Sequence, residues 1–108
     1  MIYTLEDLRR IIAPIAERYR LRAVYLFGSY AHNTATEDSD IDLLVDTEGT
    51  ELKSLFSLGA LYCDLEEALG KDVDLITVSS IQQAPCLPSE AEFQKTVWEE
   101  KVDLYAVA

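Results

Sequence analysis

The sequence predicts a small α/β domain in which helices cover a short-stranded sheet. Three observations support this expectation: helical spacing of apolar residues in three segments, runs of strand-forming residues between them, and a length of 108 residues that are 49% hydrophobic. A chain of this length builds one core, so we expect a single domain over residues 1–108. Because such a core buries only roughly 60 to 70% of the unfolded chain's surface, the site should be shallow or shared with a partner.

The first predicted element is an amphipathic helix near the N-terminus. Thr4 and Asp7 form a helix-start signal. Pro14 lies inside the helical pattern, so we expect a kink or a restart of the helix there. The apolar residues that recur at helical spacing are Leu5, Leu8, Ile12, Ile15 and Tyr19.

Two strands and a polar connection follow. Residues 23–27, AVYLF, are rich in strand formers and end at Gly28, which predicts a buried strand and a tight turn. Residues 29–39 are polar and predict one short helical turn and a loop. Acidic and apolar residues alternate in residues 40–46, DIDLLVD, which predicts a second strand. The apolar face of that strand carries Ile41, Leu43 and Val45.

The second half of the chain predicts a helix, a strand and another helix. Leucine and tyrosine residues spaced by three or four, followed by Gly70, predict a long helix over residues 51–69. Residues 72–78, DVDLITV, predict a third strand, and residues 79–88 an irregular connection with two prolines. Ser89 and Glu92 predict a capping box at the start of the last helix. The apolar residues of this helix are Phe93, Val97, Trp98, Val102 and Tyr105, and we assign Trp98 and Tyr105 to the core in preference to a nucleotide-stacking surface.

The net charge of −11 is unevenly distributed along the chain. Residues 1–36 contain five arginines and three acids, whereas residues 37–108 contain four lysines and seventeen acids. An acidic surface repels phosphate backbones, which disfavours a nucleic-acid partner. The arginines either form a solvated helix face or face a triphosphate or an acidic partner; they are Arg9, Arg10, Arg18, Arg20 and Arg22.

The cysteines and the N-terminus indicate a cytoplasmic protein. Cys63 and Cys86 lack the spacing of a zinc site, so we expect reduced, unreactive thiols. The first residues lack the basic start and apolar run of a signal peptide, and no stretch approaches 18 apolar residues. We therefore expect no membrane association.

The pair Asp40 and Asp42 is the first candidate for chemistry. Residues two apart on a strand point to the same face, with Cα atoms roughly 6.5 Å apart. Two carboxylates so placed can converge on one divalent metal or bracket two metals, and magnesium prefers such hard oxygen ligands together with substrate phosphates. Asp-x-Asp alone is a weak signal, because acidic strand ends are common.

Residues on either side of this pair strengthen the signal. Gly28 and Ser29 follow a strand, where backbone N–H groups and a hydroxyl can bind phosphate oxygens; the alternative is a turn glycine and a capping serine. Asp72 and Asp74 share one face of the third strand, and either could reach the same metal. We favour Asp74, because it lies further inside the strand, where an unpaired carboxylate is costly, and expect it also to orient or deprotonate an incoming hydroxyl.

Read together, GSYAHNTATEDSDID and KDVDLIT resemble the nucleotidyltransferase superfamily, and more narrowly the minimal nucleotidyltransferases that act as antitoxins of HEPN-type toxins. The resemblance covers nearly the whole chain. It implies a mixed-sheet nucleotidyltransferase fold, two Mg²⁺ ions on Asp40, Asp42 and Asp74, and a triphosphate on Gly28 and Ser29. It also implies that a tyrosine hydroxyl of the toxin receives AMP from ATP, within a hetero-oligomer.

The chain departs from the family pattern in one place. Members usually have Ala-Arg-Gly where this chain has Ala31-His32-Asn33. His32 is either a substitute phosphate contact or a surface residue without a role, and Asn33 tolerates the positive φ that a glycine would adopt. Two hypotheses follow: an active adenylyltransferase, or a catalytically impaired module that neutralises its partner by binding. Transfer to RNA or a small molecule is a third, disfavoured by the acidic surface. Tyr30 could stack on a base or pack in the core.

Overall fold

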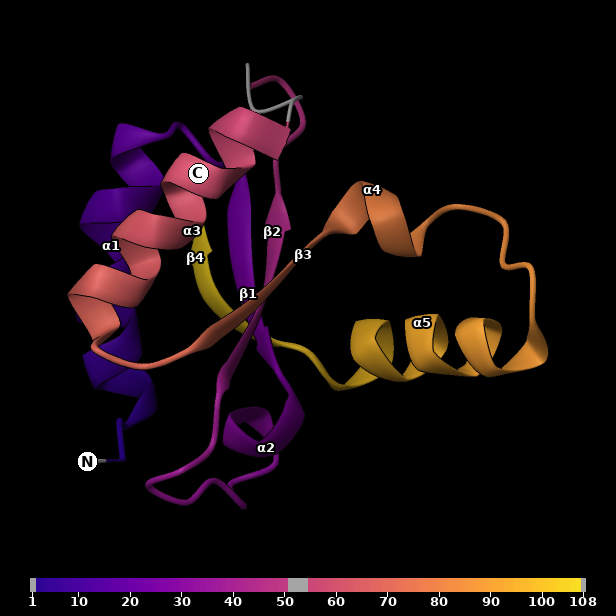
Figure 1. The fold of residues 1–108 in the computed structure, drawn as a ribbon, viewed down its shortest axis with the longest axis horizontal. Coiled ribbons are helices and arrows are strands. Elements are labelled where there is room, and N and C mark those ends of the chain that lie inside the picture. Colours follow the sequence, from indigo (N-terminus) through magenta and orange to yellow (C-terminus); the bar gives the residue numbers. More distant parts are fainter. Residues whose placement is uncertain (1, 51–54, 108) are drawn as a thin grey trace.

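The computed structural model describes residues 2–50 and 55–107, which form a sheet with helices on both faces (Figure 1). In chain order the elements are α1 (Leu5–Arg18), β1 (Ala23–Phe27), α2 (Gly28–Ala31), β2 (Ile41–Asp46), α3 (Leu55–Leu69), β3 (Val73–Thr77), α4 (Val78–Ile81), α5 (Pro88–Glu100) and β4 (Val102–Ala106). The predicted α/β class is confirmed. The first four residues of the helix predicted over 51–69 lie outside the described part of the chain.

The sheet is mixed, as the family resemblance implied. Its strand order is β3-β2-β1-β4. β1 pairs antiparallel with both β2 and β4, whereas β2 and β3 are parallel and joined by a crossover through α3. The parallel register places Asp42 opposite Asp74, which brings the two acidic segments side by side.

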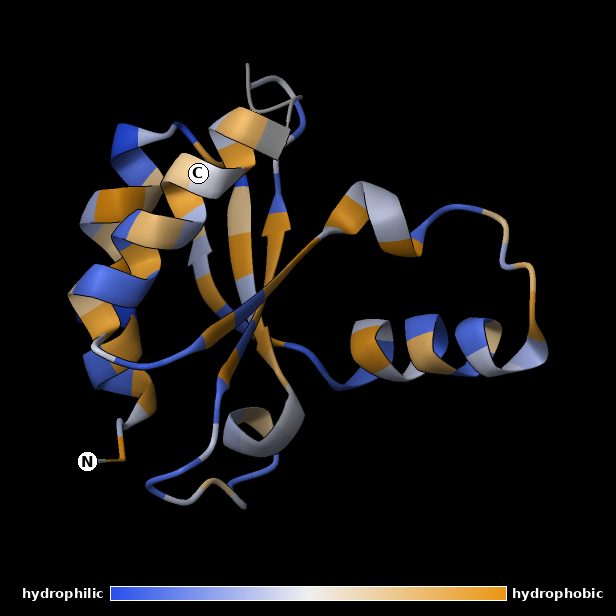
Figure 2. Cartoon of the chain, in the orientation of Figure 1, coloured by the Kyte–Doolittle hydropathy of each residue, from blue (hydrophilic) through white to orange (hydrophobic). Residues whose placement is uncertain are grey.

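The two faces of the sheet are covered unequally. α1 and α3 cover one face and bury the main core, which includes Leu8, Ile12, Leu26, Leu43 and Leu65. On the opposite face, α4 and α5 extend sideways from the sheet and bury a smaller cluster (Figure 1). That cluster consists of Phe27, Leu44, Val78, Ile81 and Val97. Hydrophobic residues line the strands between these layers (Figure 2). Asp42 shares its strand face with Leu44, so the acids lie on the sparsely covered side.

The end of the chain differs from the prediction. The last helix ends at Glu100, and Val102–Ala106 forms β4 at the sheet edge next to β1. The spacing of Val102 and Tyr105 fits a helix, but Val102, Leu104 and Ala106 also alternate, and Leu104 is buried. Pairing with β1 decides between the two patterns, because strand formation there satisfies the backbone of an otherwise open edge.

The start of α5 also differs. The predicted capping box of Ser89 and Glu92 is wrong: the helix begins at Pro88, and its N-cap Leu87 makes no side-chain capping bond. Proline suits the first helical position, because its fixed φ is helical and its missing N–H would lack a partner there. The stretch predicted to be irregular contains the short helix α4, where the Thr77 hydroxyl accepts from the Ser80 N–H at 3.2 Å.

α1 follows the sequence pattern with one correction. The Thr4 and Asp7 start signal is confirmed: the Asp7 N–H donates to Thr4 Oγ1 at 3.1 Å, and the Thr4 N–H donates to Asp7 Oδ2 at 3.2 Å. Of the kink or restart predicted at Pro14, the restart does not occur, because the helix runs through Pro14 to Arg18, and the kink stays a prediction. A proline inside a helix costs about 3 kcal/mol, and burial of the apolar face around it offsets that cost.

Candidate active site

Two carboxylates meet on the sparsely covered face of the sheet. Asp42 in β2 lies opposite Asp74 in the parallel register with β3. Burial raises the pKa of Asp42 to about 6, and the Asp74 and Asp40 carboxyl groups add to this shift. Two neighbouring carboxylates favour a positive charge between them, which a divalent cation can supply.

Asp40 and Asp74 occupy more open positions than the sequence suggested. Asp74 is exposed, so the prediction that depth in the strand distinguishes it from Asp72 is wrong; its register opposite Asp42 does so instead. Asp40 is also exposed and lines an acidic hollow of about 410 Å³ with Glu37, Asp38 and Asp72, among others. The shielded carboxyl group is that of Asp42. β2 is a central strand, whereas β3 is an edge strand.

Gly28 forms the turn directly against Asp42. Its φ is +72°, and a Cβ atom at this position would lie 2.0 Å from Asp42 Oδ2. Any side chain would therefore collide with the carboxylate and would also strain the backbone. The turn continues into α2, where the Ser29 carbonyl accepts hydrogen bonds from the Thr34 N–H at 2.9 Å and from the Thr34 hydroxyl at 3.3 Å. Gly28 thus lies directly against Asp42, and Ser29 follows it as the second residue of α2.

A pocket of about 310 Å³ opens beside this turn, and it is called the nucleotide pocket after the role proposed for it under Proposed function. Its polar side has the Asp42 carboxylate, and its apolar side includes Phe27 and Phe93, whose rings meet edge to face with centroids 6.4 Å apart. Its full lining is Phe27, Gly28, His32, Asp42, Phe93, Thr96, Val97 and Glu100. Sequence reasoning missed the contribution of α5. Phe93 and Val97 read as core residues, and nothing in the linear pattern brings them to Gly28.

His32 and Asn33 lie at the end of α2, beside the pocket. His32 is exposed, and its Nε2 lies 2.9 Å from Glu100 Oε2, which connects the end of α2 to the end of α5. The choice between a phosphate contact and a surface residue without a role stays a prediction. Asn33 has a φ of +59°, which confirms that asparagine supports the turn in place of glycine.

The aromatic residues divide between core and surface. Tyr30 is buried in the main core, which decides for packing over base stacking. Tyr105 packs partly buried against the same core from β4. Trp98 does not belong to the core: its side chain is 44% exposed, and its ring contacts Tyr25 edge to face at 6.1 Å. Lys101 Nζ lies 4.7 Å from the Trp98 ring centroid.

The arginines of α1 and the following turn lie among other partners. Arg9 donates to the Asp103 carbonyl at 3.0 Å, and Arg18 Nη2 lies 3.1 Å from Asp64 Oδ2. Arg22 precedes β1 and pairs with Glu48 at 3.0 Å, at the opposite end of the strand from Gly28. These contacts favour a solvated surface over a triphosphate site.

Two carboxylates of the site are of the kind that magnesium prefers. Asp42 and Asp74 lie opposite each other on neighbouring strands, and Asp40 directly precedes β2. Within residues 2–50 and 55–107, no group of three or more His, Cys, Asp or Glu side chains stands in a metal-holding arrangement, so Asp40 does not complete a three-carboxylate set with Asp42 and Asp74 in this structure. Magnesium suits such an open site, because it takes a few carboxylates and completes its shell with water and phosphate oxygens.

Cys63 and Cys86 are free and exposed. No helix within the described ranges has the length and apolar character needed to cross a membrane.

A mixed sheet with paired acids next to a glycine-serine turn defines a phosphoryl-transfer domain of the nucleotidyltransferase class. The chain belongs to the Polymerase beta nucleotidyltransferase family, whose model matches residues 10–105.

Two relatives and one solved structure carry the comparison further. A Methanocaldococcus jannaschii protein classed by its name among the protein adenylyltransferases is 46% identical over 77 residues, which are 71% of this chain and 81% of the relative. The protein adenylyltransferase MntA of Thermococcus cleftensis is 41% identical over 83 residues, 73% of this chain and 82% of that protein. A crystal structure described as a toxin-antitoxin with AMP-PNP superposes with a TM-score of 0.69 at 26% identity, covering 92% of this chain and 73% of the other.

Proposed function

We propose that the chain is a magnesium-dependent protein adenylyltransferase that transfers AMP from ATP to a tyrosine hydroxyl of a HEPN-type toxin and thereby acts as its antitoxin in the cytoplasm. The observation that carries this proposal is the placement of Asp42 opposite Asp74 and directly against Gly28. The names of the two relatives support AMP transfer to a protein. The toxin-antitoxin structure with an ATP analogue supports both the nucleotide and the kind of partner.

Each site residue has a role in this reaction. Asp40, Asp42 and Asp74 would hold two Mg²⁺ ions, which neutralise charge on the α-phosphate and the leaving pyrophosphate when bound. Gly28 lets the triphosphate approach the backbone, and Ser29 contributes a hydroxyl and a backbone N–H. The adenosine lies in the nucleotide pocket, against Phe27 and Phe93.

The transfer itself is an exchange of two bonds at phosphorus. The tyrosine oxygen forms a bond to the α-phosphorus, and the bond between that phosphorus and the pyrophosphate oxygen breaks. Asp74 is exposed at the sheet edge, where it can orient the hydroxyl and accept its proton. Asp42 stays shielded beneath Gly28, where its position is held by the turn.

The test compares Asp42→Asn with Asp72→Asn. Purified chain is incubated with α-labelled ATP, Mg²⁺ and a HEPN-type toxin, and labelled toxin is measured over time. We expect Asp42→Asn to lower the transfer rate at least about 100-fold, because it removes a charge that acts on the transition state. Asp72→Asn removes the same charge from an exposed position on the same strand face, outside the proposed ligand set.

The expected rate for Asp72→Asn is within about threefold of wild type. Undiminished transfer by Asp42→Asn would remove Asp42 from the site. Equal losses in both variants would indicate a general effect of charge.

A second function is favoured by one observation. His32, which departs from the arginine of the family pattern given above, lies 2.9 Å from the Glu100 carboxylate. A domain that binds its partner without catalysis would have no need of a free cation there. If this alternative holds, the double variant Asp40→Ala and Asp42→Ala still neutralises a HEPN-type toxin in cells. Loss of neutralisation, with binding to the toxin retained, would exclude it.

A further inference from the structure

Another hollow lies next to the nucleotide pocket, between α4 and α5. It measures about 360 Å³, and we call it the α4–α5 pocket. Its lining comes from β3, α4 and the first turns of α5: Ile76, Ser80, Ile81, Ser89, Glu90, Phe93 and Gln94. None of these residues belongs to the set that the proposed mechanism assigns to metal or phosphate binding, so the pocket has no role in the reaction as described so far.

The position of the α4–α5 pocket relates it to the acids. Ile76 follows Asp74 by two residues on β3, so both side chains point to the same face with Cα atoms roughly 6.6 Å apart. Phe93 lines both this pocket and the nucleotide pocket, so its ring is the wall between them. The α4–α5 pocket therefore adjoins the nucleotide pocket at Phe93, and its β3 wall, Ile76, is two residues beyond Asp74 on the same strand face.

The chemistry of the lining selects among ligands. Ile76, Ile81 and Phe93 are apolar and suit an aromatic ring. The polar side chains are two serines, a glutamine and a glutamate, and the lining has no lysine, arginine or histidine. A nucleic-acid acceptor would bring phosphate charge next to Glu90 without a cation to balance it. A neutral aromatic side chain that carries a hydroxyl fits this lining.

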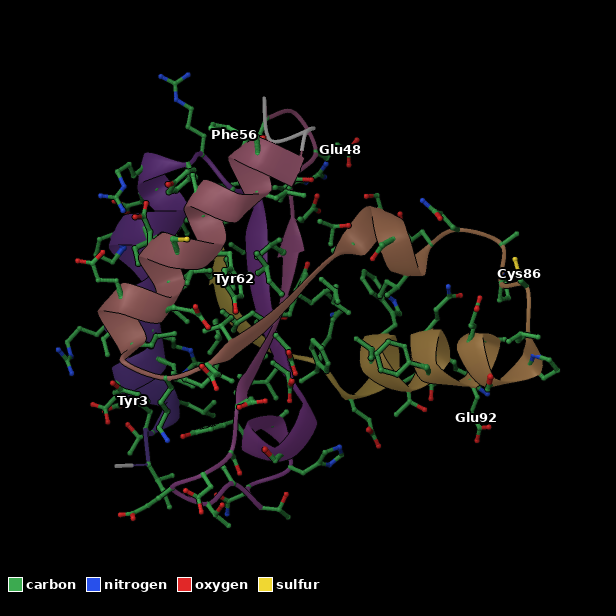
Figure 3. All side chains as sticks on the ribbon, viewed as in Figure 1. Tyr3, Glu48, Phe56, Tyr62, Cys86 and Glu92 are labelled. Atoms are coloured by element: carbon green, nitrogen blue, oxygen red, sulfur yellow. The ribbon has the colours of Figure 1, made fainter. Side chains whose placement is uncertain are left out.

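The surface around the pocket provides room for the rest of a protein partner. α5 buries only Val97 among its thirteen residues. Leu87, Phe93 and Trp98 have exposed fractions of 57%, 51% and 44%, and all three lie on or directly before this helix. Such a group of exposed apolar residues marks an interaction surface. Glu92, in contrast, points away from α4 on the other side of α5 (Figure 3).

We infer that the α4–α5 pocket is the acceptor subsite, which binds the tyrosine-bearing segment of the partner protein and presents its hydroxyl to Asp74. The assignment rests on the proposed AMP transfer to a protein tyrosine and adds to it the surface that selects the acceptor. The ring packs on Ile76, Ile81 and Phe93, and the flanking partner backbone lies on the apolar residues of α5. Phe93 separates the acceptor ring from the adenosine.

A binding experiment tests the subsite without any transfer. ¹⁵N-labelled chain with Mg²⁺ and AMP-PNP is titrated with N-acetyl-L-tyrosinamide, and amide shifts are followed by NMR. The largest shifts are expected at Ile76, Ser80 and Gln94. Gln94→Trp, which fills the pocket from α5, should raise the dissociation constant at least about tenfold. Gln83→Trp is the matched control, because Gln83 is exposed and outside the lining.

A transfer experiment uses the same two variants. With labelled ATP and a HEPN-type toxin below saturation, Gln94→Trp should lower kcat/KM at least about tenfold while its affinity for MgATP stays that of wild type. Gln83→Trp should transfer at the wild-type rate.

Several outcomes would overturn the assignment. These are N-acetyl-L-tyrosinamide shifts centred away from the pocket, unchanged binding or transfer by Gln94→Trp, and stronger binding of a single-stranded oligonucleotide in the same place. If the wild-type chain transfers no AMP, the proposed function fails, and the titration alone decides the subsite.

Discussion

Replacing Asp42 by asparagine should stabilise the fold while it removes activity. Asp42 has a pKa of about 6 in the folded chain, against 3.8 for an unperturbed aspartate, because burial and the neighbouring Asp74 disfavour its charged form. The native state therefore binds more protons than the unfolded state between these two values. The resulting loss of stability is absent below the lower pKa, grows as the pH rises through this window, and is complete above about 6.

The magnitude follows from the two pKa values. A difference of about two pKa units corresponds to about 3 kcal/mol at pH above 6, at about 1.36 kcal/mol per unit. Asp42 retains some solvent exposure, which screens part of this energy, so we expect a gain of about 1 to 3 kcal/mol in Asp42→Asn. Near pH 5 the wild-type carboxyl group is mostly protonated, and the gain should be smaller by about 1 kcal/mol.

Urea unfolding in EDTA measures this difference. Wild type, Asp42→Asn and the exposed control Asp72→Asn are compared near pH 5 and near pH 8, with circular dichroism as the readout. The stabilisation by Asp42→Asn should grow with pH, and Asp72→Asn should show no such growth. A destabilised Asp42→Asn, or a gain that is equal at both pH values, would refute the reasoning. Saturating Mg²⁺ should stabilise wild type more than Asp42→Asn, since it binds the native site.

Three further predictions follow from the structure. Gly28→Ala should destabilise the fold by more than about 1 kcal/mol and abolish MgATP binding, because it adds strain at positive φ and a clash with Asp42. Thermal melts measure the stability and calorimetric titration the binding, and near-normal ATP binding would contradict the close packing of Gly28 against Asp42. Glu100→Gln should change the free energy of unfolding by less than about 1 kcal/mol, because its pair with His32 is half exposed. It should lower the KM for MgATP about two- to fivefold, because it removes a negative charge beside the nucleotide pocket, and an unchanged or higher KM would contradict nucleotide binding there. Leu104→Ala should lower the free energy of unfolding in urea by about 2 to 4 kcal/mol, since Leu104 is only 6% exposed in the core. Val107→Ala, at a 54% exposed position, should lower it by less than about 0.5 kcal/mol, and equal losses would contradict the packing of β4 against the core.

Much of the fold was predictable from local patterns. The limits of β1, the polar turn after Gly28, and the inner face of β2 with Ile41, Leu43 and Val45 all agree with the structure. These elements could be predicted because apolar periodicity and the positive φ of a glycine depend only on neighbouring residues in the sequence. The last strand was not readable, because Val102–Ala106 fits two periodicities and only the presence of β1 beside it selects one.

The candidate site likewise contains residues that local patterns predict and residues that only the tertiary structure brings together. Gly28, Ser29, Asp40 and Asp42 lie on adjacent segments, so their spacing in the sequence predicts their neighbourhood in space. The preference for Asp74 over Asp72 rested on depth and on the family resemblance, and the exposed position of Asp74 contradicts the argument from depth. The parallel register with β2 supports it instead, and that register depends on how the crossover through α3 closes.

The sequence by itself determined the class of domain, the turn at Gly28 and the pair of acids at the start of β2, because strand period and turn chemistry are local properties of the chain. Only the tertiary structure decided which carboxyl group is shielded, that His32 meets Glu100, and that α5 forms a wall of the nucleotide pocket. These are contacts between segments distant in the sequence. Their geometry depends on sheet order and helix packing, which the pattern of any single segment does not contain.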